Sequence, residues 1–133
     1  MKNIDGRTPT RVPVIAGAGG IAVGDLVVGT LSAAVKAAAA PSAGTVIGIC
    51  TVAAAQSAVG EVELISGRVL RAPYTGSTKT SLADTDFGTV FDLSNSTTVN
   101  LDDTTGGCCV CVGYDNNNDT IDFRVPESFL YIA

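Results

Sequence analysis

The stretch Thr120-Ile121-Asp122-Phe123-Arg124-Val125 alternates polar and apolar side chains at every step. Successive side chains of a strand point to opposite faces of a sheet, so this period of two predicts a strand with Ile121, Phe123 and Val125 facing a core. Glu61-Val62-Glu63-Leu64 repeats the pattern, with carboxylates on one face and aliphatic side chains on the other. Both stretches indicate sheets with one solvated face and one buried face.

Most of the remaining chain consists of short runs rich in Val, Ile, Leu and Thr, separated by Gly, Asn, Asp, Ser and Pro. Such runs, bounded by turn residues, are typical of strands rather than helices. We therefore predict an all-β fold, a small β-barrel-like domain with at most one short helix and an extended N-terminal arm. The expected strands lie near residues 12–16, 25–31, 45–53, 60–65, 68–72, 88–93, 97–101, 108–113, 120–125 and 128–132.

Turn chemistry predicts two hairpins. The segment from Tyr114 to Thr120 is rich in Asn and Asp, which tolerate positive φ and bond their own backbone, so it is expected to join the strands on either side. Ser94-Asn95-Ser96 is expected to join a second pair. Ser66-Gly67 is compatible with a tight turn between two strands or with a glycine bulge inside one strand.

The segment Leu31 to Pro41 has two interpretations. Its alanine-rich centre has the highest helix propensity in the chain, so a short helix capped by Ser32 is one alternative. Alanine is tolerated in most conformations, and the segment is too short for propensity alone to sustain a helix. An irregular strand is therefore the other alternative.

Length and composition restrict the function. A chain of 133 residues favours one domain, which we divide into a flexible arm at residues 1–11 and a single β domain at 12–133. The start lacks the apolar segment of a secretory signal, and no run of about 18 apolar residues occurs, so we expect a cytosolic origin and no membrane partner. Eight cations and thirteen acids give a net charge of −5, the wrong sign for nucleic-acid binding.

Histidine is absent, which removes the commonest general base and every Ser-His or Cys-His pairing. Paired carboxylates are the remaining catalytic candidates, but acidic loop residues are usually solvated and no nucleophile or oxyanion hole accompanies them. We therefore expect a protein that is not an enzyme and takes no cofactor. The carboxylates concerned are Asp84, Asp86, Asp92, Asp102 and Asp103.

Two other motifs resemble ligand sites only in part. Gly17-Ala18-Gly19-Gly20-Ile21-Ala22 has the spacing of a dinucleotide-binding loop, but a turn and a strand are expected after it instead of the required helix, so we interpret it as a flexible connector. Asp115-x-Asn117-x-Asp119 copies the first three ligand positions of an EF-hand. Thr120 stands where that loop needs glycine and Pro126 where it needs glutamate. We interpret the motif as a hairpin turn, with weak cation binding as the alternative.

Four cysteines match the number in a zinc site, but their spacing does not favour one. On a strand, Cys109 and Cys111 share a face while Cys108 faces away. Together with Cys50, these residues are expected to be small buried apolar side chains in a reducing cytosol.

Charge is unevenly distributed along the chain. Residues 1–11 hold three cations and one acid, a net charge of +2, whereas residues 79–133 hold two cations and nine acids, a net charge of −7. A basic arm ahead of an acidic domain suits docking onto an acidic protein surface, the alternative being an unstructured start without a function. Farther along the chain, Arg68 is expected to form a surface ion pair with Glu63.

Four segments with a glycine before apolar residues occur in a characteristic order: Gly24-Asp25-Leu26-Val27-Val28, Gly44-Thr45-Val46-Ile47-Gly48-Ile49, Gly60 to Val69, and Gly88-Thr89-Val90-Phe91. In this order they resemble the small capsid cement, or head decoration, proteins of tailed bacteriophages. The resemblance covers about residues 12 to 113. It implies a β-rich fold often called a β-tulip, no enzymatic activity, and binding to the outside of a mature phage head.

The resemblance also implies partners and a location. The partners would be the major capsid protein and other copies of the chain in a homotrimer, on the capsid exterior of the virion after synthesis in the host cytoplasm. By position, the capsid-contact arm would be Met1 to Arg11, with Lys2, Ile4, Arg7 and Arg11 as contact residues. The rival hypothesis is a β-rich adhesion or glycan-binding module displayed on the virion, supported by the Asn/Asp-rich loop and the abundant Thr and Ser.

Overall fold

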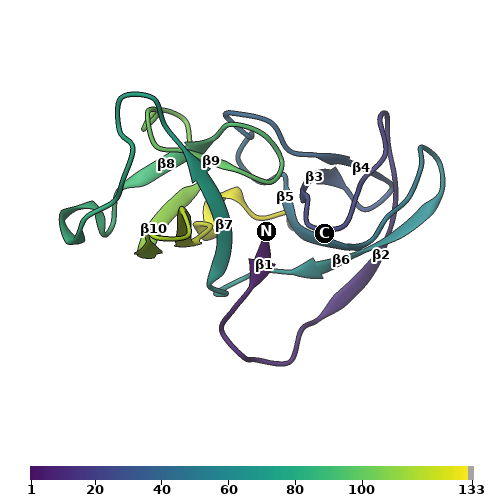
Figure 1. Ribbon diagram of the computed structural model, residues 1–133. Coiled ribbons are helices and arrows are strands. Elements are labelled where there is room, and N and C mark those ends of the chain that lie inside the picture. The colour runs from purple at the N-terminus through teal and green to yellow at the C-terminus, as the bar shows by residue number, and fades with distance from the viewer. Residues whose placement is uncertain (132–133) are drawn as a thin grey trace.

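The computed structural model describes residues 1–131 and is almost entirely β, as predicted (Figure 1). Two single-turn 3₁₀ helices, η1 (Asp84–Asp86) and η2 (Glu127–Phe129), are the helical elements of this described part. The strands are β1 (Lys2–Asn3), β2 (Arg11–Ile15), β3 (Leu26–Thr30), β4 (Ala33–Lys36), β5 (Val46–Val52), β6 (Val59–Leu64), β7 (Leu70–Thr75), β8 (Val90–Leu93), β9 (Val99–Asn100), β10 (Cys109–Asp115) and β11 (Thr120–Arg124).

The second half of the chain forms a closed five-stranded barrel. The pairings run β7-β11-β10-β8-β9 and return to β7 through a parallel pairing of β9 with Tyr74 and Thr75. Alternate side chains of these strands point inward, so Leu70 and Phe123 are fully buried while their strand neighbours face outward. Strand β1 pairs with Leu70 and Arg71 at the start of β7, whereas β9 pairs with Tyr74 and Thr75 at its end.

The first half of the chain forms a second, antiparallel sheet in the order β2-β6-β5-β3-β4. Residues Ser66 and Gly67 connect it to the barrel through a tight turn, in which Gly67 has a φ of 66° and the Arg68 N–H donates to the Ile65 carbonyl at 3.0 Å. The turn alternative is therefore correct. It joins two different sheets rather than two strands of one hairpin.

Two hydrophobic cores share the strands of the second sheet. Along β5, Val46 and Ile49 belong to the main core with the barrel side chains, whereas Ile47 and Cys50 belong to the smaller core inside the second sheet. All residues from Val46 to Cys50 are buried, because both faces of this strand are covered. The two halves of the chain therefore pack as one body.

Both ends of the described chain cross to the opposite half. Strand β1 joins the barrel, and the segment after β11 returns to the second sheet, where the Tyr131 N–H donates to the Val46 carbonyl at 2.8 Å. The strand expected at 128–132 is wrong for residues 128–131, and residue 132 lies outside the described part. Pro126 begins the turn of η2 instead, its carbonyl accepting from the Phe129 N–H at 3.0 Å, and Leu130 forms only a single bridge with Val46.

Other local predictions are confirmed. Strands β10 and β11 form the hairpin expected around the Asn/Asp-rich turn, and β8 and β9 form the second hairpin. The ambiguous segment 31–41 contains the strand β4, which pairs with β3, so the strand alternative holds. Within residues 1–131, the structure has no helix of the length and apolar character needed to cross a membrane.

Candidate functional site

The N-terminal arm, residues 1–11, begins with β1 between the two halves of the protein and then bends, with Gly6 at a φ of 74°, in a loop that leads to β2 (Figure 1). Its backbone bonds the barrel side through the Ile4 N–H, 2.9 Å from the Val69 carbonyl oxygen. It bonds the second sheet through the Met1 nitrogen, which donates to the Gly24 carbonyl at 2.8 Å, and through the Asn3 amide, which donates to Glu63 at 2.9 Å. The arm is docked in this conformation, and its flexibility stays a prediction.

Asp5 is the central acceptor that holds the arm. Its carboxylate accepts hydrogen bonds from the Arg7 N–H at 3.1 Å and the Val69 N–H at 3.3 Å, and it pairs with Arg68 at 3.2 Å and Arg7 at 3.0 Å. Partial burial alone would raise the pKa of Asp5, but these hydrogen bonds outweigh it and lower the pKa to about 2. The carboxylate therefore stays ionised at neutral pH.

The predicted ion pair between Arg68 and Glu63 is absent, because each residue has a partner on the arm. Arg68 reaches Asp5 and also donates to the Thr8 carbonyl at 2.8 Å. Glu63 accepts from the Asn3 amide instead. Residues flanking the turn between the sheets are thus used to fasten the arm to the body.

Of the four residues assigned to capsid contact, three contribute to docking within the chain. Ile4 is half-buried, Arg7 pairs with Asp5 and donates to the Gly67 carbonyl, and the Arg11 Nε lies 3.7 Å from a Glu61 oxygen. Lys2 differs from them. Its side chain is exposed and has no hydrogen bond or ion pair to any residue in 1–131.

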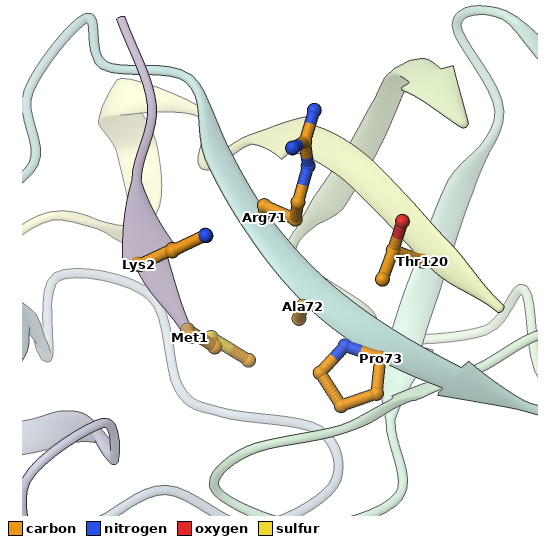
Figure 2. Close-up of a pocket in the computed structure, with 6 residues that line it drawn as sticks. All are labelled: Met1, Lys2, Arg71, Ala72, Pro73 and Thr120. Atoms are coloured by element: carbon orange, nitrogen blue, oxygen red, sulfur yellow. The ribbon is translucent and has the colours of Figure 1, made fainter. Parts of the chain in front are cut away.

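Lys2 borders a shallow hollow of about 280 Å³ on the outer face of the barrel (Figure 2). Lys2 lies directly across from Arg71 in the pairing of β1 with β7, and Thr120 of β11 lies on the far side. Figure 2 shows the Lys2 side chain extending from β1 toward β7, with Arg71 and Thr120 rising from the two neighbouring strands. The remaining lining residues are Met1, Ala72 and Pro73.

Arg71 is partly neutralised by a neighbour on β11. Its Nε and Nη2 donate to the two oxygens of Asp122 at 2.8 and 3.1 Å. These hydrogen bonds are the main reason that the pKa of Arg71 is raised, so the guanidinium remains charged at all relevant pH values. Asp115 adds a further negative charge near Arg71, so Lys2 is the side-chain cation at the hollow that has no ion-pair partner in 1–131.

A second surface feature is an apolar patch on the sheet of the first half. Ile15 of β2 and Val59 of β6 are neighbours in register, and their exposed fractions are 43% and 67%. They line a hollow together with Pro13, Val14, Leu31 and Ser32. From Val12 to Gly60 the sequence contains only two charged residues, Asp25 and Lys36, and Asp25 is buried.

The candidate catalytic carboxylates are engaged as acceptors in separate contacts. Asp102 accepts from the N–H groups of Lys79, Ser77 and Thr78, and these bonds lower the pKa of Asp102 to about 2. The buried Asp92 accepts from two backbone N–H groups. The other three bond to neighbours as well: Asp84 to the Tyr114 hydroxyl, Asp86 to the Ala83 N–H and Lys79, and Asp103 to the Thr105 N–H.

The glycine-rich segment 17–22 is a connector, as interpreted from the sequence. No helix follows it, since Val23 and Gly24 form a turn and β3 begins at Leu26. Gly20 has a φ of 68°, and a Cβ at this position would lie 2.6 Å from the Ala54 carbonyl oxygen. Glycine is required here by backbone packing rather than by a phosphate.

The four cysteines are buried and free, as predicted, but they belong to different cores. Cys50 packs in the second sheet, whereas the other three lie in the barrel. Cys108 was expected to face away from Cys109, yet it precedes β10 and is also buried, with the two sulfurs 4.0 Å apart. Among residues 1–131, no group of three or more His, Cys, Asp or Glu side chains is arranged to hold a metal ion.

The Asn/Asp-rich loop bonds to itself and to the barrel. Asp115 accepts from the Asn117 N–H at 2.9 Å and from the Asn118 side chain at 2.7 Å. Asn116, which the EF-hand comparison left out, accepts from the Tyr74 hydroxyl at 2.8 Å and from the Leu82 N–H at 2.9 Å. The loop is a hairpin turn that also fastens the segment around Leu82.

Sequence reasoning missed the residues that join Lys2 at the hollow. Arg71 and Pro73 alternate with buried side chains in β7, and this alternation could have assigned both to the outer face. Their nearness to Lys2 could not be anticipated, because β1 is only two residues long and has no periodicity.

No known family model matches the chain, and a search of curated proteins finds no relative of it. The class that the structure defines is a small all-β protein with a closed barrel, a second sheet packed on it, and an arm that bonds to both.

Proposed function

We propose that this chain is a virion structural protein that binds the outer surface of a tailed-phage capsid and stabilises the shell. The observation that carries the proposal is the arm, which has no regular structure between β1 and β2 and is attached to the body by hydrogen bonds and ion pairs, with Met1 packed against the main core. The order of glycine-led segments that resembles capsid cement proteins supports the same function. In this role the chain needs no cofactor and acts through contacts rather than catalysis.

The attachment of the arm suits exchange between partners. The ion pairs of Arg7 and Arg11 are accessible, since these side chains are 58% and 54% exposed, and exposed ion pairs contribute little net free energy. The pair of Asp5 with Arg68 is mostly buried, at 11% and 13% exposed. A neighbouring protein surface can therefore replace the contacts of Arg7 and Arg11 at small cost, while Asp5 keeps the start of the arm attached. Many copies on a lattice would multiply a modest affinity per copy through avidity.

The apolar patch around Ile15 and Val59 supports binding to other proteins. Exposed apolar side chains that lie together mark interaction surfaces more often than isolated ones do. The nearly uncharged sequence from Val12 to Gly60 lets this half approach another protein without the desolvation of charged groups. Contacts between copies in a homotrimer, or with the major capsid protein, are proposed for this patch.

Co-sedimentation tests the proposed function. The purified chain is mixed with expanded and with unexpanded heads of the phage that encodes it, and the heads are pelleted. We expect the chain to pellet with expanded heads and to do so less when residues 1–11 are deleted. If the full-length chain stays in the supernatant with both kinds of head, the proposal is wrong.

A glycan-binding module remains the second candidate, and one observation favours it. Phe87 is 50% exposed and its ring centroid lies 5.9 Å from that of Tyr114, which gives an aromatic surface next to the hairpin turn. Aromatic faces are common contacts for ligands with apolar faces. Binding to a glycan array that disappears in Phe87→Ala would favour this function, and repeating the array with Ca²⁺ would test the cation alternative at the turn.

A further inference from the structure

We propose that the hollow between β1, β7 and β11 binds a carboxylate side chain from an acidic segment of a partner protein, with Lys2 and Arg71 as the recognising cations. The inference names the partner chemistry for shell binding and in that sense rests on the proposed function. It adds Arg71 and Thr120, which lie in the barrel, to the contact residues of the arm.

The charges on β1 and β7 favour an incoming carboxylate. Like charges directly opposite each other on neighbouring strands destabilise a sheet, and Lys2 and Arg71 are opposite in register. Asp122 forms an ion pair with Arg71, whereas Lys2 forms no ion pair with any residue in 1–131. An incoming carboxylate would remove this repulsion, which makes an acidic partner more favourable here than a neutral one.

The guanidinium of Arg71 has one edge that no residue in 1–131 uses. Asp122 uses Nε and Nη2, and no residue in 1–131 accepts from Nη1. A guanidinium can bind two carboxylates through different edges, because its five N–H donors lie in one plane. The Arg71 side chain is 40% exposed, so the unused edge is accessible.

The lining of the hollow combines cationic and apolar groups. Met1, Ala72 and Pro73 provide an apolar lining beside the two cations, and Thr120 adds a hydroxyl at the opposite side (Figure 2). An acidic side chain on a peptide presents the same combination, a carboxylate next to aliphatic and backbone atoms. A bare inorganic anion would use the cations but not the apolar lining.

The test is a titration of the ¹⁵N-labelled chain, followed by NMR, with a blocked hexapeptide of alternating Asp and Gly. We expect shifts at the amides of Lys2, Arg71 and Thr120, weaker at high salt because exposed charges are screened. Lys2→Glu should reduce affinity by roughly twofold to fivefold, the scale of an exposed ion pair. A peptide of alternating Lys and Gly should cause no shifts there.

Lys36→Glu is the matched control. It produces the same change in net charge on an exposed residue of β4, in the other sheet. We expect it to bind the acidic peptide like the wild type. Equal weakening by both variants, shifts centred elsewhere, or tighter binding of inorganic phosphate than of the peptide would each overturn the proposal.

Co-sedimentation with heads separates this inference from the proposed function. If Lys2→Glu pellets as well as Lys36→Glu while the wild type also pellets, the chain binds shells without using the hollow, and the inference fails alone. If the wild type binds the acidic peptide at the hollow but pellets with no heads, the hollow is supported and the shell function fails.

Discussion

Two buried carboxylates fix loops of this protein through hydrogen bonds. Asp25 accepts from the Ala22 N–H at 2.9 Å and from the Ser96 hydroxyl at 2.8 Å, and so connects the second sheet to the barrel. Asp92, only 2% exposed, accepts from the Ala40 N–H at 2.9 Å with both oxygens. Buried charges of this kind are retained where several donors satisfy them.

We predict that Asp92→Ala destabilises the fold. The N–H groups of Ala40 and Leu93 would lose their acceptor, and a buried unpaired donor costs about 1–3 kcal/mol. Urea unfolding measures the loss in the free energy of unfolding. The exposed Glu127→Ala variant serves as the control and is expected to change stability by about 0.5 kcal/mol or less. Equal stability of the two variants would contradict the role given to Asp92.

At the scale of elements, the arm is fastened mainly through Asp5. We predict that Asp5→Ala detaches residues 2–5 at neutral pH, because the bonds to Arg7, Arg68 and Val69 are all lost. Amide hydrogen exchange at Ile4, whose N–H bonds Val69, should accelerate roughly tenfold or more. Exchange in the barrel, for example at Phe123, should stay unchanged.

The attachment of the arm through Asp5 should depend on pH. The pKa of Asp5 is about 2 in the folded state, below its ordinary value of 3.8. The contribution to docking is therefore complete above about pH 4 and is lost as the pH falls through about 2. Protection of the Ile4 amide in the wild type should follow this course. Protection that is unaffected by both acid and Asp5→Ala would show that Asp5 does not hold the arm.

Local patterns in the sequence predicted most elements correctly. Alternation in Thr120–Arg124 and turn chemistry around Asn95 and Asn117 both depend on neighbours in the chain. They can therefore be interpreted without knowledge of tertiary contacts. Strand β1 was missed because a two-residue strand exists only through its partner β7. The segment after Pro126 was assigned wrongly because its apolar residues anchor a turn to β5 rather than form a ladder.

At the scale of the whole molecule, the division of the strands into two sheets could not be predicted from the sequence. The Ser66-Gly67 turn has the composition of a hairpin turn, and its neighbours Leu64 and Leu70 belong to different sheets for reasons of long-range packing. The site shows the same limit. The cations of the arm were identified, but their partners Glu61 and Gly67 on the body follow from the path of the arm across it.

Because the two cores share strands, we predict that the protein unfolds in one transition. Leu26 lies in the main core and its neighbour Val27 in the second, and both are fully buried. Leu26→Ala should cost about 2–5 kcal/mol and Val27→Ala somewhat less, and each should shift the single calorimetric transition. Val23→Ala, at a side chain that is 67% exposed, is the control. A protein that unfolds in two calorimetric transitions, one shifted by Leu26→Ala and the other by Val27→Ala, would contradict a shared core.

The crossing of the two ends has a consequence for a chain cut once. Ser66 and Gly67 are exposed, which makes their turn accessible to a protease. After cleavage there, the fragment that carries β1 would still contribute a strand to the barrel, and the fragment that carries Tyr131 would still bond to β5. Each fragment thus contributes a segment to the sheet of the other fragment. We expect the cleaved protein to migrate as one complex until it is denatured.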